Sequence, residues 1–187
     1  MTESDLNFTF PPDWIVRKFD ATGAYRSVSG HGLKGVDFLC LVGADEVYLI
    51  EVKNFYRRGK RQLAVRRDPQ ALADHVGRKF ADTRRLVAIV LRAMQRRWHV
   101  RMLLFYYSLH RRPRPGSHYW FWAEAARRLA VPDHVHCVLW LETPEGGEHY
   151  ETATANGLRQ WLQEGNRLTI AERGRTGGLP IRVRAAT

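Results

Sequence analysis

Residues 35–55 read GVDFLCLVGADEVYLIEVKNF, and this stretch decides the fold. It contains two apolar runs, Val36–Val42 and Val47–Val52, separated by a short polar turn. Such runs predict a hairpin of largely buried β-strands. The charged residues set into these runs or directly after them are Asp37, Glu51 and Lys53. Because a buried charge is costly unless something binds or pairs it, these three side chains indicate a functional site.

The register of the hairpin decides whether the three charges can meet. Side chains alternate along a strand, so Glu51 and Lys53 project from one face. Asp37 joins them only if its partner on the second strand is odd-numbered. A three-residue loop, residues 43–45, gives that register and needs a left-handed residue, expected at Asp45. An even-numbered loop would require a β-bulge to bring the two carboxylates together.

Carboxylates at this position suit a hard divalent cation. Asp37, Glu51 and the main-chain carbonyl of Val52 are oxygen ligands, which Mg²⁺ or Mn²⁺ binds while keeping several waters. Lys53 beside such an ion would orient or help deprotonate a water and offset charge on a phosphorane-like transition state. The hairpin therefore predicts a small metal site with a catalytic lysine.

The pattern of Asp37 followed by Glu51-Val52-Lys53 resembles the PD-(D/E)XK nuclease superfamily. This restriction-endonuclease-like fold is shared by restriction enzymes, Holliday-junction resolvases and many repair nucleases. The likeness covers the hairpin directly and, more loosely, the order of elements to about Leu141, with Val36 where the family has proline. It implies a Mg²⁺-dependent endonuclease acting most readily on DNA, with Asp37, Glu51 and Lys53 as the catalytic residues.

The family often adds polar residues from neighbouring helices. Lys79 resembles an auxiliary residue in the helix that follows the catalytic strand, although a surface pair with Asp82 at i,i+3 is an alternative. A first helix sometimes supplies another acidic ligand, and Asp13 and Asp20 are the candidates. A helix cap or a solvated carboxylate is the alternative for each of these two acids.

Basic residues stand on both sides of the hairpin. His31 and Lys34 lie in a glycine-bearing approach to Asp37, where they would contact the scissile phosphate or simply lie in water. The basic stretch after Lys53 is where a phosphate backbone would run, unless it is only a solvated face. Its residues expected to bind nucleic acid are Arg57, Arg58, Lys60, Arg61, Arg66 and Arg67.

The composition indicates a polyanionic partner. The 187 residues carry a net charge of +11, from 30 Lys and Arg against 19 Asp and Glu, which favours nucleic acid. No apolar run approaches the length of a membrane span, and no signal peptide is evident. Cys40 and Cys137 lie in apolar runs, as expected of reduced thiols in a cytoplasmic protein.

Periodicity along the chain predicts the remaining elements. Asp68 and Pro69 begin a long helix that continues to Met94, with a bend suggested at Gly77. Further helices are expected at residues 13–19, 117–130 and 154–164, and further strands at 100–107, 134–141 and 179–183. The fold class is therefore α/β, with a mixed sheet of four to five strands flanked by helices. We expect one domain, residues 1–187, with a core at about 13–164 and an extension or edge strand at 165–187.

Other functions remain open at this level. His134 and His136 alternate on a predicted strand and would bind zinc only with a third ligand from elsewhere. Packing is expected to take most of the rings at residues 119–122, and one or two exposed ones would stack on unpaired bases. The chain would alternatively be an inactive nucleic-acid-binding or assembly subunit that kept the fold, or a basic protein with an acidic protein partner. Two cuts in a duplex would favour a homodimer, and a partner protein in a defence, mobile-element or repair system is a further alternative.

Overall fold

The computed structural model describes residues 1–23, 25, 32–55, 68–110, 112–143 and 148–186. Its larger sheet has the strand order β3-β4-β5-β6-β7, antiparallel from β3 to β5 and parallel from β5 to β7. The strand bounds are β3 Ile15–Lys18, β4 Phe38–Val42, β5 Glu46–Asn54, β6 Val135–Glu142 and β7 Arg167–Ala171. This mixed sheet confirms the predicted α/β class.

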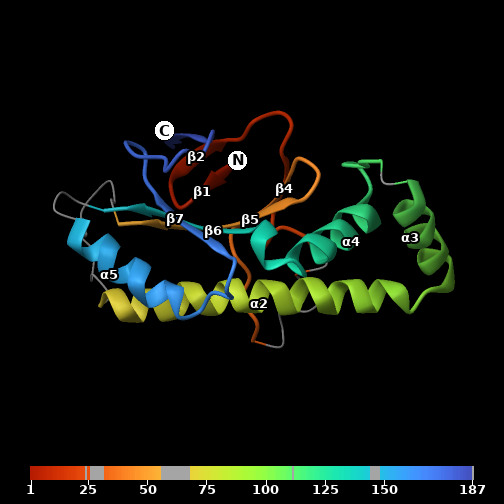
Figure 1. The fold of residues 1–187 in the computed structure, drawn as a ribbon. Helices are drawn as coiled ribbons and strands as arrows, with labels where there is room; N and C mark the ends of the chain where they lie inside the picture. The colour runs from red at the N-terminus through yellow and green to blue at the C-terminus, as the bar shows by residue number, and fades with distance from the viewer. Residues whose placement is uncertain (24, 26–31, 56–67, 111, 144–147, 187) are drawn as a thin grey trace.

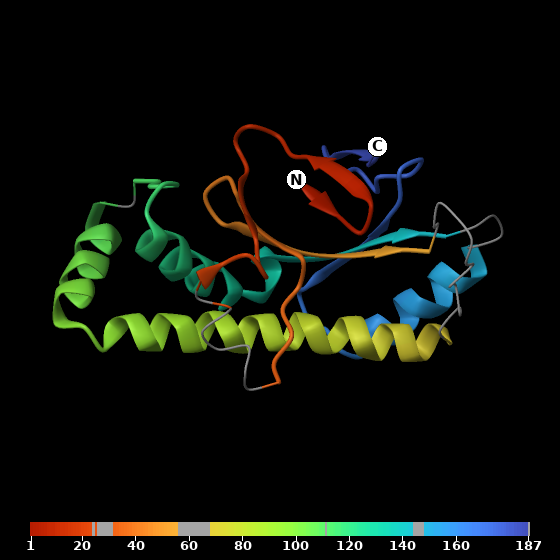
Figure 2. The same ribbon diagram turned by 180° about the vertical axis from the view of Figure 1, so that it is seen from behind.

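Both faces of the larger sheet are covered. A small antiparallel sheet, β1-β2-β8, covers one face, with bounds β1 Thr2–Glu3, β2 Leu6–Thr9 and β8 Arg182–Ala185. Helices lie on the other side, with bounds α2 Pro69–Gln95, α3 Trp98–His110, α4 His118–Leu129 and α5 Glu148–Arg159. Figure 1 shows α2 running the length of the molecule below the sheet, with α5 near its start and α3 at its far end. The reverse view shows the same layers (Figure 2).

The hairpin of β4 and β5 has the predicted register. Phe38 pairs with Ile50 and Val42 pairs with Glu46, so the loop consists of residues 43–45. The pairing ends at Phe38, and Asp37, just before β4, donates its main-chain N–H to the Ile50 carbonyl at 3.1 Å. The predicted odd-length loop is therefore confirmed.

The hairpin loop is held by a buried arginine from α4. The Arg128 guanidinium donates hydrogen bonds to the main-chain carbonyls of Val42, Gly43 and Glu46, at 3.0, 3.1 and 2.7 Å. The left-handed residue in the loop is Gly43, with φ 54°. The prediction of a left-handed Asp45 was therefore wrong, because the turn places this conformation at glycine, which has no Cβ to oppose it.

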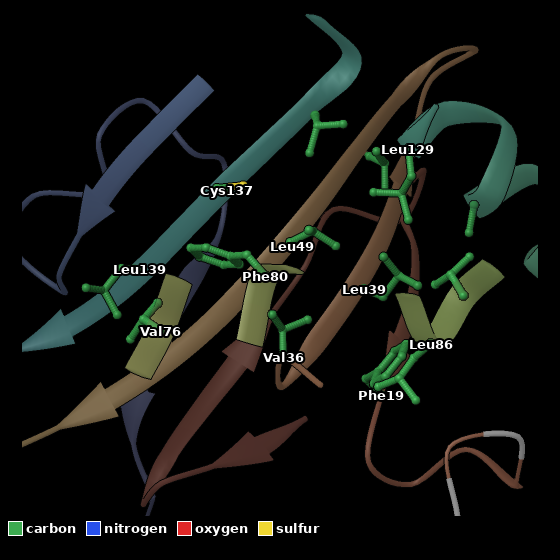
Figure 3. Close-up of a cluster of buried hydrophobic side chains, with 14 of the residues drawn as sticks. Phe19, Val36, Leu39, Leu49, Val76, Phe80, Leu86, Leu129, Cys137 and Leu139 are labelled. Atoms are coloured by element: carbon green, nitrogen blue, oxygen red, sulfur yellow. The ribbon is translucent and has the colours of Figure 1, made fainter. Parts of the chain in front are cut away.

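The register divides the sheet residues between two cores. Odd-numbered residues of the hairpin, such as Leu39 and Leu49, pack beneath the helices against Phe80 of α2 (Figure 3). Even-numbered residues, such as Phe38 and Ile50, pack against the small sheet. Burial of both faces explains why both strands are almost continuously apolar. Glu51 and Lys53, at odd-numbered positions of β5, therefore face the helices.

The long helix begins as predicted. The Asp68 carboxylate accepts a hydrogen bond from the main-chain N–H of Ala71 at 3.2 Å, with proline in the first turn. Its apolar face is buried against the sheet over its first six turns. A Cβ on Gly77 would lie 2.2 Å from the Trp161 ring, so this glycine allows close packing of Trp161.

Two predicted elements were wrong. Residues Ile15–Lys18 form strand β3 rather than a helix, because they complete the main-chain hydrogen bonds at the open edge of β4. Residues 100–107 lie in helix α3 rather than in a strand. A continuous apolar run does not distinguish a strand from a helix by its period, and no glycine or proline interrupts this run.

The remaining elements follow the prediction with shifted ends. Helix α4 and strand β6 lie at their predicted places, whereas α5 begins at Glu148 rather than Thr154. Strand β7 was not predicted, and β8 begins slightly later than residues 179–183. Outside the range expected for the core, Leu6, Phe8 and Ile181 are buried in the cluster beneath the small sheet.

Candidate active site

Four charged side chains meet between the hairpin and α2. Glu51 and Lys53 come from β5, Asp37 directly precedes β4, and Lys79 comes from α2. We call this set the acid–lysine cluster. Alternation along β5 turns Glu51 and Lys53 toward the helix layer, where Lys79 contacts Glu51. Asp37 joins them through its contacts with the Val52 main-chain N–H and with Lys79.

Glu51 is the centre of the cluster. Its side chain is fully buried, at 0% exposure, yet both of its oxygens are engaged. The Lys79 ammonium lies 2.7 Å from Oε1 and 2.8 Å from Oε2, and Lys53 donates to Oε1 as well. Two ammonium groups thus compensate a carboxylate that would otherwise be very costly to bury.

Asp37 lies at the edge of the same cluster. Its Oδ2 accepts a hydrogen bond from the Val52 main-chain N–H at 2.7 Å, and Oδ1 lies 3.6 Å from the Lys79 ammonium. Burial, reinforced by the negative charge of Glu51, raises the pKa of Asp37 to about 6, although Lys79 and the Val52 N–H oppose this shift. Asp37 is therefore a carboxylate that binds a proton more readily than usual.

Lys79 contacts both acids. Burial lowers the pKa of Lys79, but the carboxylates of Glu51 and Asp37 outweigh that effect and raise it above its ordinary value, so the ammonium stays charged. The alternative surface pair with Asp82 does not form. Asp82 instead accepts the Lys34 main-chain N–H at 3.3 Å and lies 3.7 Å from Arg85.

Two polar residues of α2 position the cluster and were missed in the sequence. The Thr83 hydroxyl accepts the Val36 main-chain N–H at 3.0 Å and donates to the Lys79 carbonyl at 2.7 Å. Asp82 anchors Lys34 in the same way, so both tie the approach to Asp37 onto the helix. Their signal was present in the sequence, since an acid and a threonine at 82 and 83 interrupt the apolar face of α2.

The other side-chain candidates are exposed or lie outside the described residues. The side chains of Lys34, Asp13 and Asp20 are exposed. Val52 turns its side chain into the core beneath the small sheet. The candidates that fall outside the described residues are His31, Arg57, Arg58, Lys60, Arg61, Arg66 and Arg67. Their proposed contacts with phosphate stay predictions.

The histidine pair considered for zinc does not share a strand face. His134 ends the short 3₁₀ helix Pro132–His134, whereas His136 lies in β6. The His136 ring stacks on Tyr48 with centroids 4.1 Å apart, and its Nε2 lies 3.3 Å from Glu46. Throughout the described part of the chain, no three His, Cys, Asp or Glu residues are grouped to hold a metal ion.

The acid–lysine cluster nevertheless fits a small cation that is held mainly by water. The carboxylates of Asp37 and Glu51 already converge on one cation, the Lys79 ammonium. Two carboxylates and a main-chain carbonyl are few ligands, but Mg²⁺ keeps several waters and needs only one or two carboxylates from a protein. Asp37, Glu51 and the Val52 carbonyl are thus the groups that would hold such an ion.

Comparisons of the chain with models of protein families, with curated proteins and with solved structures gave no match. None of the helices within the described residues has the length and apolar character needed to cross a membrane. The function must therefore be argued from the cluster itself.

Proposed function

We propose that this chain is a metal-dependent nuclease that hydrolyses phosphodiester bonds, most readily in DNA, on a restriction-endonuclease-like core. The observation that carries the proposal is the convergence of two carboxylates, the buried Glu51 and the partly buried Asp37, on one cation, the Lys79 ammonium. Lys53, on the same face as Glu51, supplies the positive charge that the D…ExK pattern requires. The net charge of +11 favours a polyanionic substrate.

The residues of the cluster have distinct roles in this proposal. Asp37, Glu51 and the Val52 carbonyl would hold Mg²⁺ or Mn²⁺, which would supply Lewis acidity and a more acidic water. Lys53 would orient the attacking water and offset charge on the phosphate oxygens. Lys79 holds the two carboxylates together and would have to give up part of its contact with them when they bind an ion.

A second candidate function is supported by the same contacts. Glu51 is already paired with two ammonium groups, and the cluster as a whole has two acids and two lysines. Such a neutral set is stable without any metal, as expected of a nucleic-acid-binding or assembly subunit that no longer cleaves. The two candidates differ in one respect, which is hydrolysis in the presence of Mg²⁺.

A cleavage assay on supercoiled plasmid, linear duplex and single-stranded DNA, with Mg²⁺, with Mn²⁺ and with EDTA, tests the proposal. We expect metal-dependent cleavage that falls at least about 100-fold in Asp37→Asn, Glu51→Gln and Lys53→Ala, because each removes a preorganised charge. Glu164→Gln is the matched control, since Glu164 is an exposed acid away from the cluster. Thermal melting should show that each variant is folded.

Two results would overturn the nuclease proposal. One is a folded wild-type protein that binds DNA but cleaves none of the three substrates with either metal, which would favour the non-cleaving subunit. The other is cleavage that persists in all three cluster variants, which would show that the activity belongs to another site or to a contaminant.

A further inference from the structure

Helix α3 exposes an apolar face at the end of the molecule. The residues Trp98, Met102, Phe105 and Leu109 are spaced by four, three and four positions, so they lie on one side of the helix. Their exposed fractions are 76, 60, 60 and 65%. Val100 is the buried residue of this helix. Single exposed apolar residues are ordinary, but a continuous row of large ones indicates a binding surface.

Positive charge surrounds this row. Between Asp82 and Glu124 the sequence has nine arginines and no acid. Four of these arginines, Arg92, Arg96, Arg97 and Arg101, are exposed near the junction of α2 and α3. Within the described part of the chain, none of the four forms an ion pair, in contrast to Arg127 and Arg128 of α4. The arginines at this end of the molecule therefore remain available to an anionic partner.

Aromatic rings and arginines together match an unpaired nucleic-acid strand. Bases stack on exposed rings such as Trp98 and Phe105, while arginines contact the phosphates between them. An open groove beside Phe105, lined also by Gln95, Arg101, Leu104 and Ser108, adds polar groups that can contact a base or sugar. In a duplex the base faces are covered by their neighbours, so this combination favours a single strand.

A second copy of the chain fits this face less well. A two-fold dimer through α3 would bring the same surface of each copy together. The arginines near the α2–α3 junction would then face arginines of the other copy, without an acid between Asp82 and Glu124 to pair with them. Such like-charge contacts oppose association. Charge complementarity thus favours a polyanion over self-association.

We propose that the outward face of α3, with the last turn of α2, binds an unpaired segment of a nucleic-acid strand. The proposal rests on the proposed function only in taking nucleic acid as the partner, and it requires no cleavage. Lys79 and Gln95 are 16 positions apart on α2, about 24 Å along the helix. A single strand would therefore need several nucleotides to reach from α3 to the acid–lysine cluster.

Binding of the full chain to labelled oligonucleotides in EDTA tests this proposal without any hydrolysis. Fluorescence anisotropy would compare an oligothymidylate of about 20 nucleotides with a duplex of the same length. We expect Trp98→Ala and Phe105→Ala each to weaken single-strand binding about 5-fold or more, and the double variant more strongly, with little change for duplex. Trp98→Phe, which keeps a ring, should retain most of the affinity. Ile89→Ala, which removes an exposed apolar side chain from α2, is the matched control.

The arginines give a second readout. Changing Arg96, Arg97 and Arg101 to Gln should reduce the salt dependence of single-strand binding by about 0.7 in the log–log slope for each phosphate that no longer has an arginine partner. The proposal would be overturned if the ring and arginine variants kept the wild-type affinity for single strands and the wild-type salt dependence. Metal-dependent cleavage would still be judged by the cluster variants. A wild-type dimer that Phe105→Ala converts to a monomer, with unchanged DNA binding, would overturn it in favour of a second copy. Failure of the wild type to bind any nucleic acid would overturn both proposals.

Discussion

The acid–lysine cluster and the outward face of α3 depart from ordinary packing in opposite ways. The cluster buries charged groups, and each has an oppositely charged partner, with Glu51 fully enclosed between Lys53 and Lys79. The face of α3 exposes large apolar side chains, and the four exposed arginines near it, Arg92, Arg96, Arg97 and Arg101, have no acidic partner among the described residues. The charges of one region are thus paired within the chain, whereas the other region leaves apolar side chains exposed and arginines without an acidic partner among the described residues.

This difference shows what each region contributes to stability. Buried charges in contact make the free energy of folding depend strongly on every member of the set. Exposed side chains without partners contribute little to folding, so they can be exchanged with small effects on stability. Substitutions in the two regions should therefore differ in their effect on unfolding, and this expectation can be measured.

The largest effect is expected for Glu51→Ala. Removing this carboxylate leaves Lys53 and Lys79 close together, with Asp37 as the one acid among the described residues that still contacts Lys79, whose ammonium is largely buried. The loss of one partner from a buried ion pair typically costs about 3–5 kcal/mol. Urea unfolding followed by circular dichroism should show this loss, whereas Glu164→Ala should change the free energy of unfolding by less than about 0.5 kcal/mol. A loss below about 1 kcal/mol for Glu51→Ala would mean that the cluster is hydrated in solution.

A smaller and opposite effect is expected for Asp37→Asn. Since the pKa of Asp37 is about 6 in the folded protein against an ordinary 3.8, the folded state binds the proton more tightly. The contribution of Asp37 to the free energy of unfolding therefore falls as pH rises from about 4 to about 6, by roughly 2–3 kcal/mol. At pH 7.5 in EDTA, Asp37→Asn should be more stable than the wild type by up to about 2 kcal/mol.

The pH dependence provides the control for this substitution. The difference in unfolding free energy between wild type and Asp37→Asn should shrink as pH falls through 6 and approach zero near pH 4. A difference that does not change with pH would show that Asp37 has an ordinary pKa in solution. From the sequence alone, neutralising either acid is expected to stabilise the protein by relieving buried negative charge. The structure predicts different effects for the two acids, because Lys79 lies 2.7 Å from Glu51 but 3.6 Å from Asp37.

Much of the cluster could be predicted from the sequence because short-range rules determine it. Alternation along β5 suffices to bring Glu51 and Lys53 to one face, and the odd-length loop brings the start of β4 beside them. Asp37, just before β4, reaches the same cluster through Lys79 and the Val52 main-chain N–H. The place of Lys79 was less certain, because it depends on how α2 is rotated against the sheet. That rotation is set by tertiary packing around Phe80 and Thr83. Periodicity predicts which side of the helix is buried, but it does not predict which residues of the sheet that side contacts.

The end of the molecule around α3 was less predictable for a physical reason. The run from Val100 to Tyr107 is apolar at nearly every position, so it has no clear period to separate helix from strand. Aromatic and β-branched residues favoured a strand, whereas the structure extends the chain as a helix after the short turn at Arg96 and Arg97. The apolar content that suggested a buried central strand belongs largely to a surface helix.

The smallest effect on stability is expected on the outward face of α3. Phe105 is 60% exposed, whereas Val100 on the same helix is fully buried. Phe105→Ala should therefore change the free energy of unfolding by no more than about 0.5 kcal/mol, while Val100→Ala should cost about 1–3 kcal/mol by leaving a cavity. Urea unfolding of the pair, at equal low protein concentration, measures both values on one helix. A large loss for Phe105→Ala that grows with protein concentration would show that α3 is already covered by a second copy in solution. The contrast between a cluster whose charges are paired within the chain and an exposed helix face would then no longer hold.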